Sequence, residues 1–364
     1  MITVMESMNA KAFLNTVLNN VFDSMHTIVT DNYDARRFSY DGVDRSNIFD
    51  SRRHASYMAL FTEKYEAFYS TWLLLSDAVS RERFLRLIQY RLLGHLHCRI
   101  NDAIRAGSDN HFYQTVAGWE TGASPLAAAG MFGTLRHFEN IEFGDQQLRL
   151  DCWPGNVVST FLKRQYYFER SDVRIQPEAG DTVIDAGACL GDTAVCFAVS
   201  VGHEGKVYSF DPLPTHVSAT KHNIEQNGFG EHIAIIPMAV GDATRHTDMK
   251  ITADQGVSPG FSIVGQEDSM PMTTIDDFVE TEKIGRIDFI KMDIEGAELA
   301  ALRGGVKTLV RDRPKLAISL YHRPEDFFTI PQFLSSVLPS YDFYLEHYKV
   351  HSEETVLYGR PRWP

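Results

Sequence analysis

The feature that most constrains the fold begins near residue 180, where short β-branched runs alternate with stretches of helical pattern. The runs that predict strands cover residues 182–186, 206–211, 232–237, 287–293 and 315–321. The stretches that predict helices cover residues 192–201, 214–227, 296–310 and 325–338. This alternation is typical of βαβ units, and it predicts a parallel sheet covered by helices.

The end of the chain departs from this rhythm. Residues 341–347 and 354–358 read as two strands with too few residues between them for a crossover helix. Parallel neighbours need a dozen or more connecting residues, so these strands should form an antiparallel hairpin. The sequence therefore predicts an α/β fold with a Rossmann-like, mostly parallel, doubly wound sheet of seven strands that ends in an antiparallel hairpin.

The first part of the chain has a different, mainly helical pattern. Apolar residues recur at helical spacing in residues 6–30 and 56–75, and Ser80 reads as the N-cap of a third helix. Residues 122–133 read as a flexible connection. A length of 364 residues favours two domains. We expect a mainly helical domain over residues 1–155, acting as a cap, an acceptor-recognition module or an oligomerisation surface, and a second domain over residues 156–364.

Composition excludes several classes of protein. The chain has 35 basic and 48 acidic residues, a net charge of −13, and the acidic excess lies mostly beyond residue 150. A nucleic-acid partner would favour a basic surface, so we expect none. No apolar run approaches the length of a membrane span, and the start lacks the pattern of a secretion signal. Four cysteines without a CxxC pair fit a reduced, cytoplasmic protein.

The turn after the first predicted strand is the most informative segment. The strand ends in Asp185, Gly187 allows a tight turn, and Gly191 allows the next helix to approach closely. Asp192 and Thr193 then fall in the first turn of that helix. Ligands of such sheets lie beyond the carboxyl ends of the strands. The glycine spacing differs from the dinucleotide fingerprint GxGxxG. An acid before this turn would repel the pyrophosphate of NAD but attract the ammonium group of S-adenosylmethionine. Both observations favour S-adenosylmethionine over NAD as the cofactor.

Two further acids follow the second and third predicted strands. Asp211 stands about 20 residues beyond the first turn, where an acid can accept hydrogen bonds from ribose hydroxyls; alternatively, it caps the helix that starts near Pro214. Asp242 follows the third strand, where it either pairs with the adenine amino group or serves only as a turn residue.

The segments Asp-Ala-Gly-Ala-Cys-Leu-Gly-Asp-Thr at 185–193 and Asp-Phe-Ile-Lys-Met-Asp-Ile-Glu-Gly-Ala-Glu at 288–298 resemble the FkbM-type methyltransferases. These are class I enzymes that depend on S-adenosylmethionine, and many are O-methyltransferases. The resemblance covers roughly residues 165–360. It implies that Asp185, Gly187 and Gly191 surround the methionine part of the cofactor and that Asp211 holds the ribose. The full set of cofactor-binding candidates is Asp185, Gly187, Ala188, Gly191, Asp192, Thr193, Asp211, Asp242 and Asp293.

The candidates for catalysis lie at the ends of the fourth and fifth predicted strands. Asp293 ends the fourth strand, and Glu295 points to the same face if the chain stays extended. His322 follows the fifth strand and titrates near neutrality, which suits a general base. Glu298 is explained either by function or by a favourable position in the first turn of a helix. These carboxylates could act as a base or bind a divalent metal ion. The sequence does not require a metal. Lys291 is placed to pair with one of them.

Two flanking segments are candidates for covering the site. One aromatic residue of 166–168 is expected to close over the cofactor, unless all three are core residues. The loop at 258–269 is long enough to be a substrate lid.

The function favoured by these residues is O-methylation of a hydroxyl on a sugar, a glycan or another small molecule. The alternatives are an N-methyltransferase acting on an amine and a catalytically silent cofactor-binding or scaffold module. A homo-oligomer formed through the N-terminal domain is one of the roles considered for that domain.

Overall fold

The structure is a computed structural model that describes residues 8–35, 50–126, 129–130, 133–247 and 270–362. The chain divides into two compact units. The first comprises residues 1–110, 320–336 and 342–357, and the second comprises residues 111–319, 337–341 and 358–364. Because a compact unit need not fold by itself, the predicted domain boundary at residue 155 stays a prediction.

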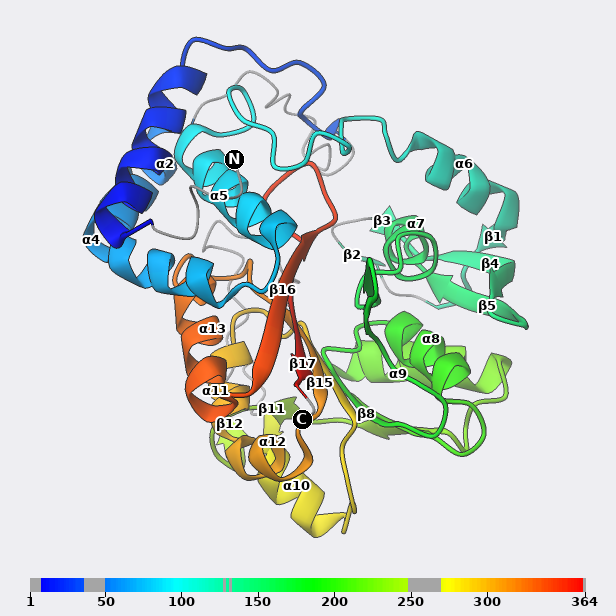
Figure 1. Ribbon diagram of the computed structural model, residues 1–364. Helices are drawn as coiled ribbons and strands as arrows, with labels where there is room; N and C mark the ends of the chain where they lie inside the picture. Colours follow the sequence, from blue (N-terminus) through cyan, green and yellow to red (C-terminus); the bar gives the residue numbers. More distant parts are fainter. Residues whose placement is uncertain (1–7, 36–49, 127–128, 131–132, 248–269, 363–364) are drawn as a thin grey trace. The chain divides into compact units, whose positions relative to one another are not determined.

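A seven-stranded sheet has the order β10-β9-β8-β14-β15-β17-β16. Figure 1 labels its strands β8, β15, β16 and β17. Its strands are β8 (Thr182–Ala186), β9 (Lys206–Phe210), β10 (Ile233–Ile236), β14 (Phe289–Met292), β15 (Lys315–Ser319), β16 (Tyr341–His347) and β17 (Thr355–Pro361). The first five strands pair in parallel. Only residues 348–354 join β16 to β17, so these two strands form the closing hairpin. The predicted architecture is confirmed.

The order of the strands creates a switch point between β8 and β14. From β8 the chain moves outward to β9 and β10, and it then returns to place β14 on the other side of β8. The connections that leave β8 and β14 therefore run in opposite directions and leave a crevice at their carboxyl ends. In open α/β sheets this crevice is the usual position of a ligand.

The helices between these strands follow the predicted pattern, except that α10 was not predicted and one predicted helix is broken. They are α8 (Asp192–Val201), α9 (Pro214–Gln226), α10 (Ile275–Thr281), α11 (Glu298–Arg303) and α12 (Val306–Asp312). A single helix was expected over residues 296–310, but Gly304 and Gly305 interrupt it. A Cβ atom on Gly304 would lie 2.1 Å from the carbonyl oxygen of Gly241, so a glycine is required where these two segments meet.

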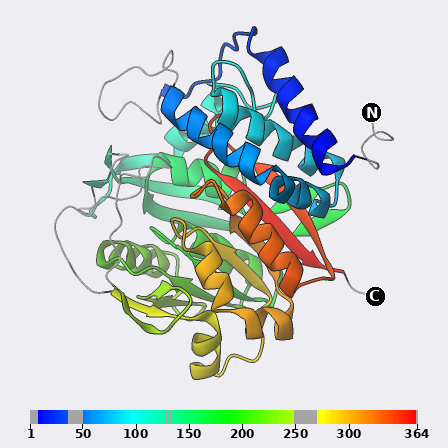
Figure 2. The ribbon, with the colours of Figure 1, turned by 90° about the vertical axis from the view of Figure 1, so that its left-hand side faces the viewer.

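Three helices form the core of the first unit together with α13 (Asp326–Val337). They are α2 (Ala10–Ser24), α4 (Ser51–Leu74) and α5 (Ala78–Leu93), which lie side by side (Figure 2). Buried aromatic rings join them, as where Phe68 of α4 lies 5.1 Å from Phe328 of α13 between ring centroids. The expected N-cap at Ser80 is wrong, because Asp77 caps α5 by accepting a hydrogen bond from the Ser80 amide at 2.6 Å.

An antiparallel sheet that the sequence analysis did not predict lies between residues 120 and 152. After α6 (Asn110–Trp119), β1 (Glu120–Ala123) pairs with β4 (Arg136–Phe143), which pairs with β5 (Gln146–Cys152). The alternation of Leu148, Leu150 and Cys152 after the Gly144 turn was the available signal. In β4 a bulge near Asn140, whose φ is +59°, interrupts the alternation of buried and exposed residues, so the strand pattern is not recognisable in the sequence.

The remaining elements are short. They are β2 (Ala129–Gly130), β3 (Gly133–Thr134), α7 (Pro154–Val157), the π-helix η2 (Val158–Leu162), β6 (Phe168–Arg170), β7 (Val173–Ile175), β11 (Ala239–Val240), β12 (Arg245–Thr247) and β13 (Met270–Thr273). Among the described residues, no helix is long and apolar enough to cross a membrane.

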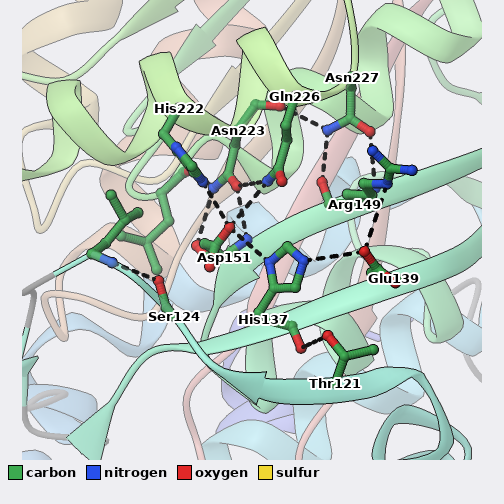
Figure 3. A network of polar contacts seen from close by, with 12 residues as sticks. Thr121, Ser124, His137, Glu139, Arg149, Asp151, His222, Asn223, Gln226 and Asn227 are labelled. Atoms are coloured by element: carbon green, nitrogen blue, oxygen red, sulfur yellow. Dashed lines mark hydrogen bonds and ion pairs between the residues drawn. The ribbon is translucent and has the colours of Figure 1, made fainter.

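A buried carboxylate attaches α9 to the sheet of β1, β4 and β5 (Figure 3). Asp151 of β5 is wholly buried, and its Oδ2 atom lies 3.0 Å from His137 Nδ1 and 2.9 Å from His222 Nε2. Asn223 of α9 exchanges hydrogen bonds with the Asp151 backbone and donates a third to the carbonyl of Leu190 at 2.8 Å. The β5 strand therefore supports both α9 and the loop that follows β8.

Candidate active site

A pocket opens at the carboxyl ends of four parallel strands, at the switch point of the sheet. Its lining comes from the segments after β8, β9, β10 and β14, namely Gly187, Cys189, Phe210, Asp211, Pro212, Leu213, His216, Met238, Ala239, Val240, Asp293, Ile294, Glu295 and Ala297. Four of the residues predicted from the sequence, Gly187, Asp211, Asp293 and Glu295, are thus brought together. Carboxylates and apolar side chains share the wall, as expected of a site for a partly apolar cation.

The loop after β8 is shaped by two glycines in the left-handed region. Gly187 has a φ of +84°, and a Cβ atom on it would lie 1.9 Å from the carbonyl oxygen of Asp293. Gly191 has a φ of +81°, and a Cβ atom on it would meet Thr220 of α9 at 2.9 Å. Between them, Ala188 is buried and its amide donates to the carbonyl of Phe210 at 3.0 Å. Both glycines therefore permit close approaches, one to the β14 segment and one to α9.

The carboxylate of Asp211 contacts two segments beside the pocket. Its Oδ2 atom accepts a hydrogen bond from the Cys189 amide at 3.0 Å and lies 3.0 Å from Nδ1 of His216. Its Oδ1 atom accepts from the Leu213 amide at 3.0 Å, which is the turn role considered for it in the sequence. The carboxylate therefore joins the β8 loop to the start of α9 while it lines the pocket.

His216 is a pocket residue that was not among the site residues predicted from the sequence. It lies in the first turn of α9 and is buried, with 6% of its surface exposed. The available signal was its place five residues beyond Asp211, just inside a helix that begins with proline.

Asp185 lies behind the pocket rather than on its wall. Its carboxylate is buried, accepts a hydrogen bond from the Thr193 hydroxyl at 2.7 Å and lies 3.1 Å from Nζ of Lys291. Lys291 Nζ also donates to the carbonyl of Gly187 at 2.7 Å. Burial lowers the pKa of Lys291, but Asp185 and the neighbouring carboxylates raise it by more, so the net shift is upward. Lys291 thus forms an ion pair with Asp185 of the neighbouring strand, and Asp293 of its own segment also raises its pKa.

Asp192 at the start of α8 is also buried behind the loop. It accepts hydrogen bonds from Asn156 Nδ2 at 2.9 Å and from the Thr160 hydroxyl at 2.5 Å. Burial raises the pKa of this carboxyl, although both hydrogen bonds oppose the shift. Asp192 therefore ties α7 and the π-helix η2 to the loop that carries Gly187.

The acids after β14 take three different positions. Asp293 and Glu295 both line the pocket, although the chain does not stay extended between them. Glu295 has a φ of +55° and Gly296 a φ of +91°, so the backbone turns sharply before α11. Glu298 is fully buried and accepts a hydrogen bond from the Ile294 amide at 2.8 Å, which closes this turn. Left-handed residues other than glycine concentrate at functional sites.

The other predicted residues are not among those that line this pocket. The side chain of Asp242 is 51% exposed, is not part of the pocket lining and lies 3.6 Å from Arg245. His322 belongs to the first unit, three residues beyond the end of β15, and is buried. The predicted lid at 258–269 lies outside the described residues. The carboxylates of Asp293 and Glu298 approach within 4.8 Å of one another.

Comparison with known proteins shows what this part of the chain resembles. Residues 185–345 match the family model of the methyltransferase FkbM domain. Among curated proteins, the hexuronic acid methyltransferase AglP of Haloferax volcanii is 26% identical over 136 residues, which cover 37% of this chain. These residues cover 54% of AglP, so the chain spans about half the length of this relative. The resemblance predicted from the two segments is confirmed.

A solved structure shares the fold. The structure of methyltransferase FkbM from Methylobacillus flagellatus KT has a TM-score of 0.52 to this chain and 19% sequence identity. The match covers 83% of this chain and 60% of that one. At this identity, the likeness concerns the arrangement of helices and strands.

Proposed function

We propose that this protein, whose residues 185–345 form a methyltransferase domain of the FkbM type, transfers a methyl group from S-adenosylmethionine to a hydroxyl of a sugar. The observation that carries the proposal is the pocket at the switch point, where Gly187, Asp211 and Asp293 share one wall. This is where open α/β sheets bind their ligands. The chemistry of its lining suits a cofactor that combines a cation, a ribose and an apolar ring.

The pocket fits the adenosine end of the cofactor. It encloses about 110 Å³, less than the roughly 300–1,000 Å³ typical of whole ligand sites, so it suits part of a larger molecule. Asp211 supplies an acceptor for ribose hydroxyls, and the contacts of Cys189 and His216 hold its carboxylate in place. The apolar side chains of Leu213, Met238 and Val240 supply a surface for the adenine ring.

The loop after β8 contributes through its shape. Because Asp185 is paired with Lys291, it serves mainly to fix the loop rather than to present a free charge. The same holds for Thr193, whose hydroxyl donates its hydrogen bond to Asp185. We therefore assign the remaining cation preference of the pocket to Asp293 and Glu295, which line it directly.

When bound, S-adenosylmethionine supplies a methyl group on a sulfonium that is already reactive. The protein then has to align the acceptor hydroxyl with that methyl and take up its proton. We assign proton uptake to Asp293, Glu295 or His322. The parallel neighbours β14 and β15 end at the same edge of the sheet, and His322 follows β15 by three residues. His322 is therefore the candidate base from the neighbouring strand.

The acceptor class follows from the relative and from the charge of the chain. AglP is described as a hexuronic acid methyltransferase, which supports a sugar as the acceptor. A net charge of −13 and three carboxylates at the pocket favour a neutral sugar over an anionic one. The N-terminal helices are proposed to recognise this acceptor or to form a homo-oligomer.

Calorimetric titration with S-adenosylmethionine, S-adenosylhomocysteine and NAD tests the cofactor assignment. We expect S-adenosylmethionine and S-adenosylhomocysteine to bind and NAD not to bind; a chain that binds neither of the first two contradicts the proposal. A methyl-donor assay then compares neutral sugars, hexuronic acids and amines, with mass spectrometry of the product. Methylation of amines alone would favour N-methylation. Binding without turnover on any acceptor class would favour a silent module.

A further inference from the structure

We propose that Tyr166 is a positioning residue of this site, which holds the Asp293 carboxylate in place on the pocket wall. The inference rests on the proposed function, because it gives Asp293 a task in methyl transfer. Tyr166 lies outside the residues that match the FkbM domain. It comes from the segment between η2 and β6, more than 120 residues before Asp293 in the chain.

The phenol of Tyr166 makes a directed contact with Asp293. Its hydroxyl donates a hydrogen bond to Oδ2 of Asp293 at 2.7 Å. The same oxygen accepts a hydrogen bond from Nε2 of Gln165 at 3.1 Å, which leaves the phenol proton for the carboxylate. Tyr166 is 5% exposed and Gln165 is 2% exposed, so water competes little with this pair. A hydrogen bond to a charged acceptor in such surroundings is strong and fixes the side chain.

The ring of Tyr166 has a second, separate contact. Nζ of Lys291 lies 5.1 Å from the ring centroid, within the range of a cation–π interaction. The same ammonium is bound to Asp185 and to the carbonyl of Gly187. The ring therefore contacts the cation of the buried pair, while the hydroxyl holds the carboxylate that lines the pocket. Removal of the hydroxyl alone should leave the ring contact intact.

The backbone at Tyr166 is held in an unfavourable conformation. Its φ is +76°, and Arg164 two residues earlier has a φ of +52°. For a bulky residue this is a true outlier, and such strain persists only where surrounding contacts impose it. The Tyr166 amide donates to the hydroxyl of Tyr358 at 3.1 Å, and the Gln165 amide donates to the carbonyl of Ser159 at 2.9 Å.

The segment before Tyr166 is anchored as well. Asn156 and Thr160 both donate to Asp192 in the first turn of α8. Thr160 lies in the π-helix η2, and such helices often occur at functional sites. One end of this segment is therefore bound to Asp192 at the start of α8, and at the other end the Tyr166 phenol contacts Asp293 after β14.

Tyr167 provides a matched control for the experiment. It is the next residue in the chain and is buried to a similar degree, at 7% exposed. Its hydroxyl, however, lies 2.7 Å from Oγ of Ser200 and donates to the carbonyl of Cys196 in α8. Replacement of either tyrosine by phenylalanine removes one buried hydroxyl, but only Tyr166→Phe removes a contact with Asp293.

The first measurement compares kcat, KM and S-adenosylhomocysteine affinity in the two variants. We expect Tyr166→Phe to lower kcat at least tenfold while the affinity for S-adenosylhomocysteine changes less than threefold. Tyr167→Phe should keep kcat within threefold of the wild type. Equal kcat values in the two variants, or a loss of cofactor affinity that accounts for the whole effect, would overturn the positioning role.

The second measurement does not depend on activity. In a double-mutant cycle, the losses of Tm caused by Tyr166→Phe and Asp293→Asn should not add, whereas those of Tyr167→Phe and Asp293→Asn should. Additive losses for the first pair overturn the inference. A wild-type chain that fails to bind S-adenosylhomocysteine would overturn the proposed function instead, and the cycle would still decide whether Tyr166 holds Asp293.

Discussion

The Nζ atom of Lys291 lies 3.1 Å from Oδ1 of Asp185, and both side chains are almost wholly buried. Asp185 is directly opposite Lys291 in the parallel pairing of β8 with β14. The pair therefore joins the two strands that flank the switch point. Through the carbonyl of Gly187 it also reaches the loop that shapes the pocket.

Lys291→Met is expected to destabilise the protein by about 3–5 kcal/mol, because it leaves the Asp185 carboxylate buried without its cation. Chemical denaturation monitored by circular dichroism measures the change. Addition of Asp185→Asn to the same chain should recover part of the loss. Lys221→Met, at an exposed pair with Glu225, serves as the control and should change stability by less than about 1 kcal/mol. Equal effects at the two lysines would contradict the structural role of the pair.

Gly187→Ala is expected to abolish S-adenosylhomocysteine binding and to destabilise the fold, because the new Cβ atom meets the Asp293 carbonyl. Gly180→Ala is a matched control, since Gly180 has a φ of +85° but no atom within 4 Å of the added Cβ. The control isolates the cost of a left-handed alanine, roughly 1–2 kcal/mol. Similar losses of stability and of binding in both variants would show that the close approach is unimportant.

Asp211→Asn is expected to lower the affinity for S-adenosylhomocysteine at least tenfold, because the amide offers a single acceptor oxygen where the carboxylate offers two. His216→Ala should lower it less, since His216 acts by holding Asp211. Calorimetric titration measures both.

Asp242→Asn separates the two interpretations of that residue. Because Asp242 is half exposed and outside the pocket lining, we expect a change in affinity of less than threefold. A loss as large as that of Asp211→Asn would instead place Asp242 at the adenine.

The central sheet could be predicted because its signals are local. The run of residues 182–186 and the helix of residues 192–201 were predicted with the bounds that the structure has. Contacts between distant segments could not be predicted in this way. The partner of Lys291 lies more than 100 residues away, and the phenol that meets Asp293 comes from outside the family match. The backbone turn at Glu295 was missed because only Gly296 signals it in the sequence.

His322→Ala and Asp293→Ala are expected to leave the affinity for S-adenosylhomocysteine, which lacks the sulfonium charge, nearly intact and to lower turnover at least tenfold, because each removes a candidate proton acceptor. Calorimetric titration measures the affinity for the cofactor, and the methyl-donor assay measures kcat. His203→Ala, at a histidine whose side chain is 88% exposed, is the control for the removal of an imidazole. Wild-type turnover in both of the first two variants would remove these residues from the mechanism.

Asp151 is expected to make the stability of the second unit depend on pH. Burial raises the pKa of its carboxyl, but hydrogen bonds with Ser124, His137 and His222 lower it by more, so the net shift is downward. A carboxyl whose pKa is depressed on folding stabilises the protein at pH values above its ordinary pKa, near 3.9. This contribution is lost as the pH falls through the pKa of the folded state.

Asp151→Asn is therefore expected to lower the free energy of unfolding at pH 7 by about 1–3 kcal/mol, because charged hydrogen bonds are replaced by neutral ones. The difference between variant and wild type should shrink as the pH falls below about 4, because the unfolded wild-type carboxyl then begins to take up a proton and the stabilisation by the charged carboxylate is lost. Urea denaturation between pH 3 and pH 7 measures this difference. Asp145→Asn, at an exposed position on the turn before β5, is the control and should show neither effect. A difference at Asp151 that stays constant across this range would mean that the carboxyl acts through its shape and not through its charge.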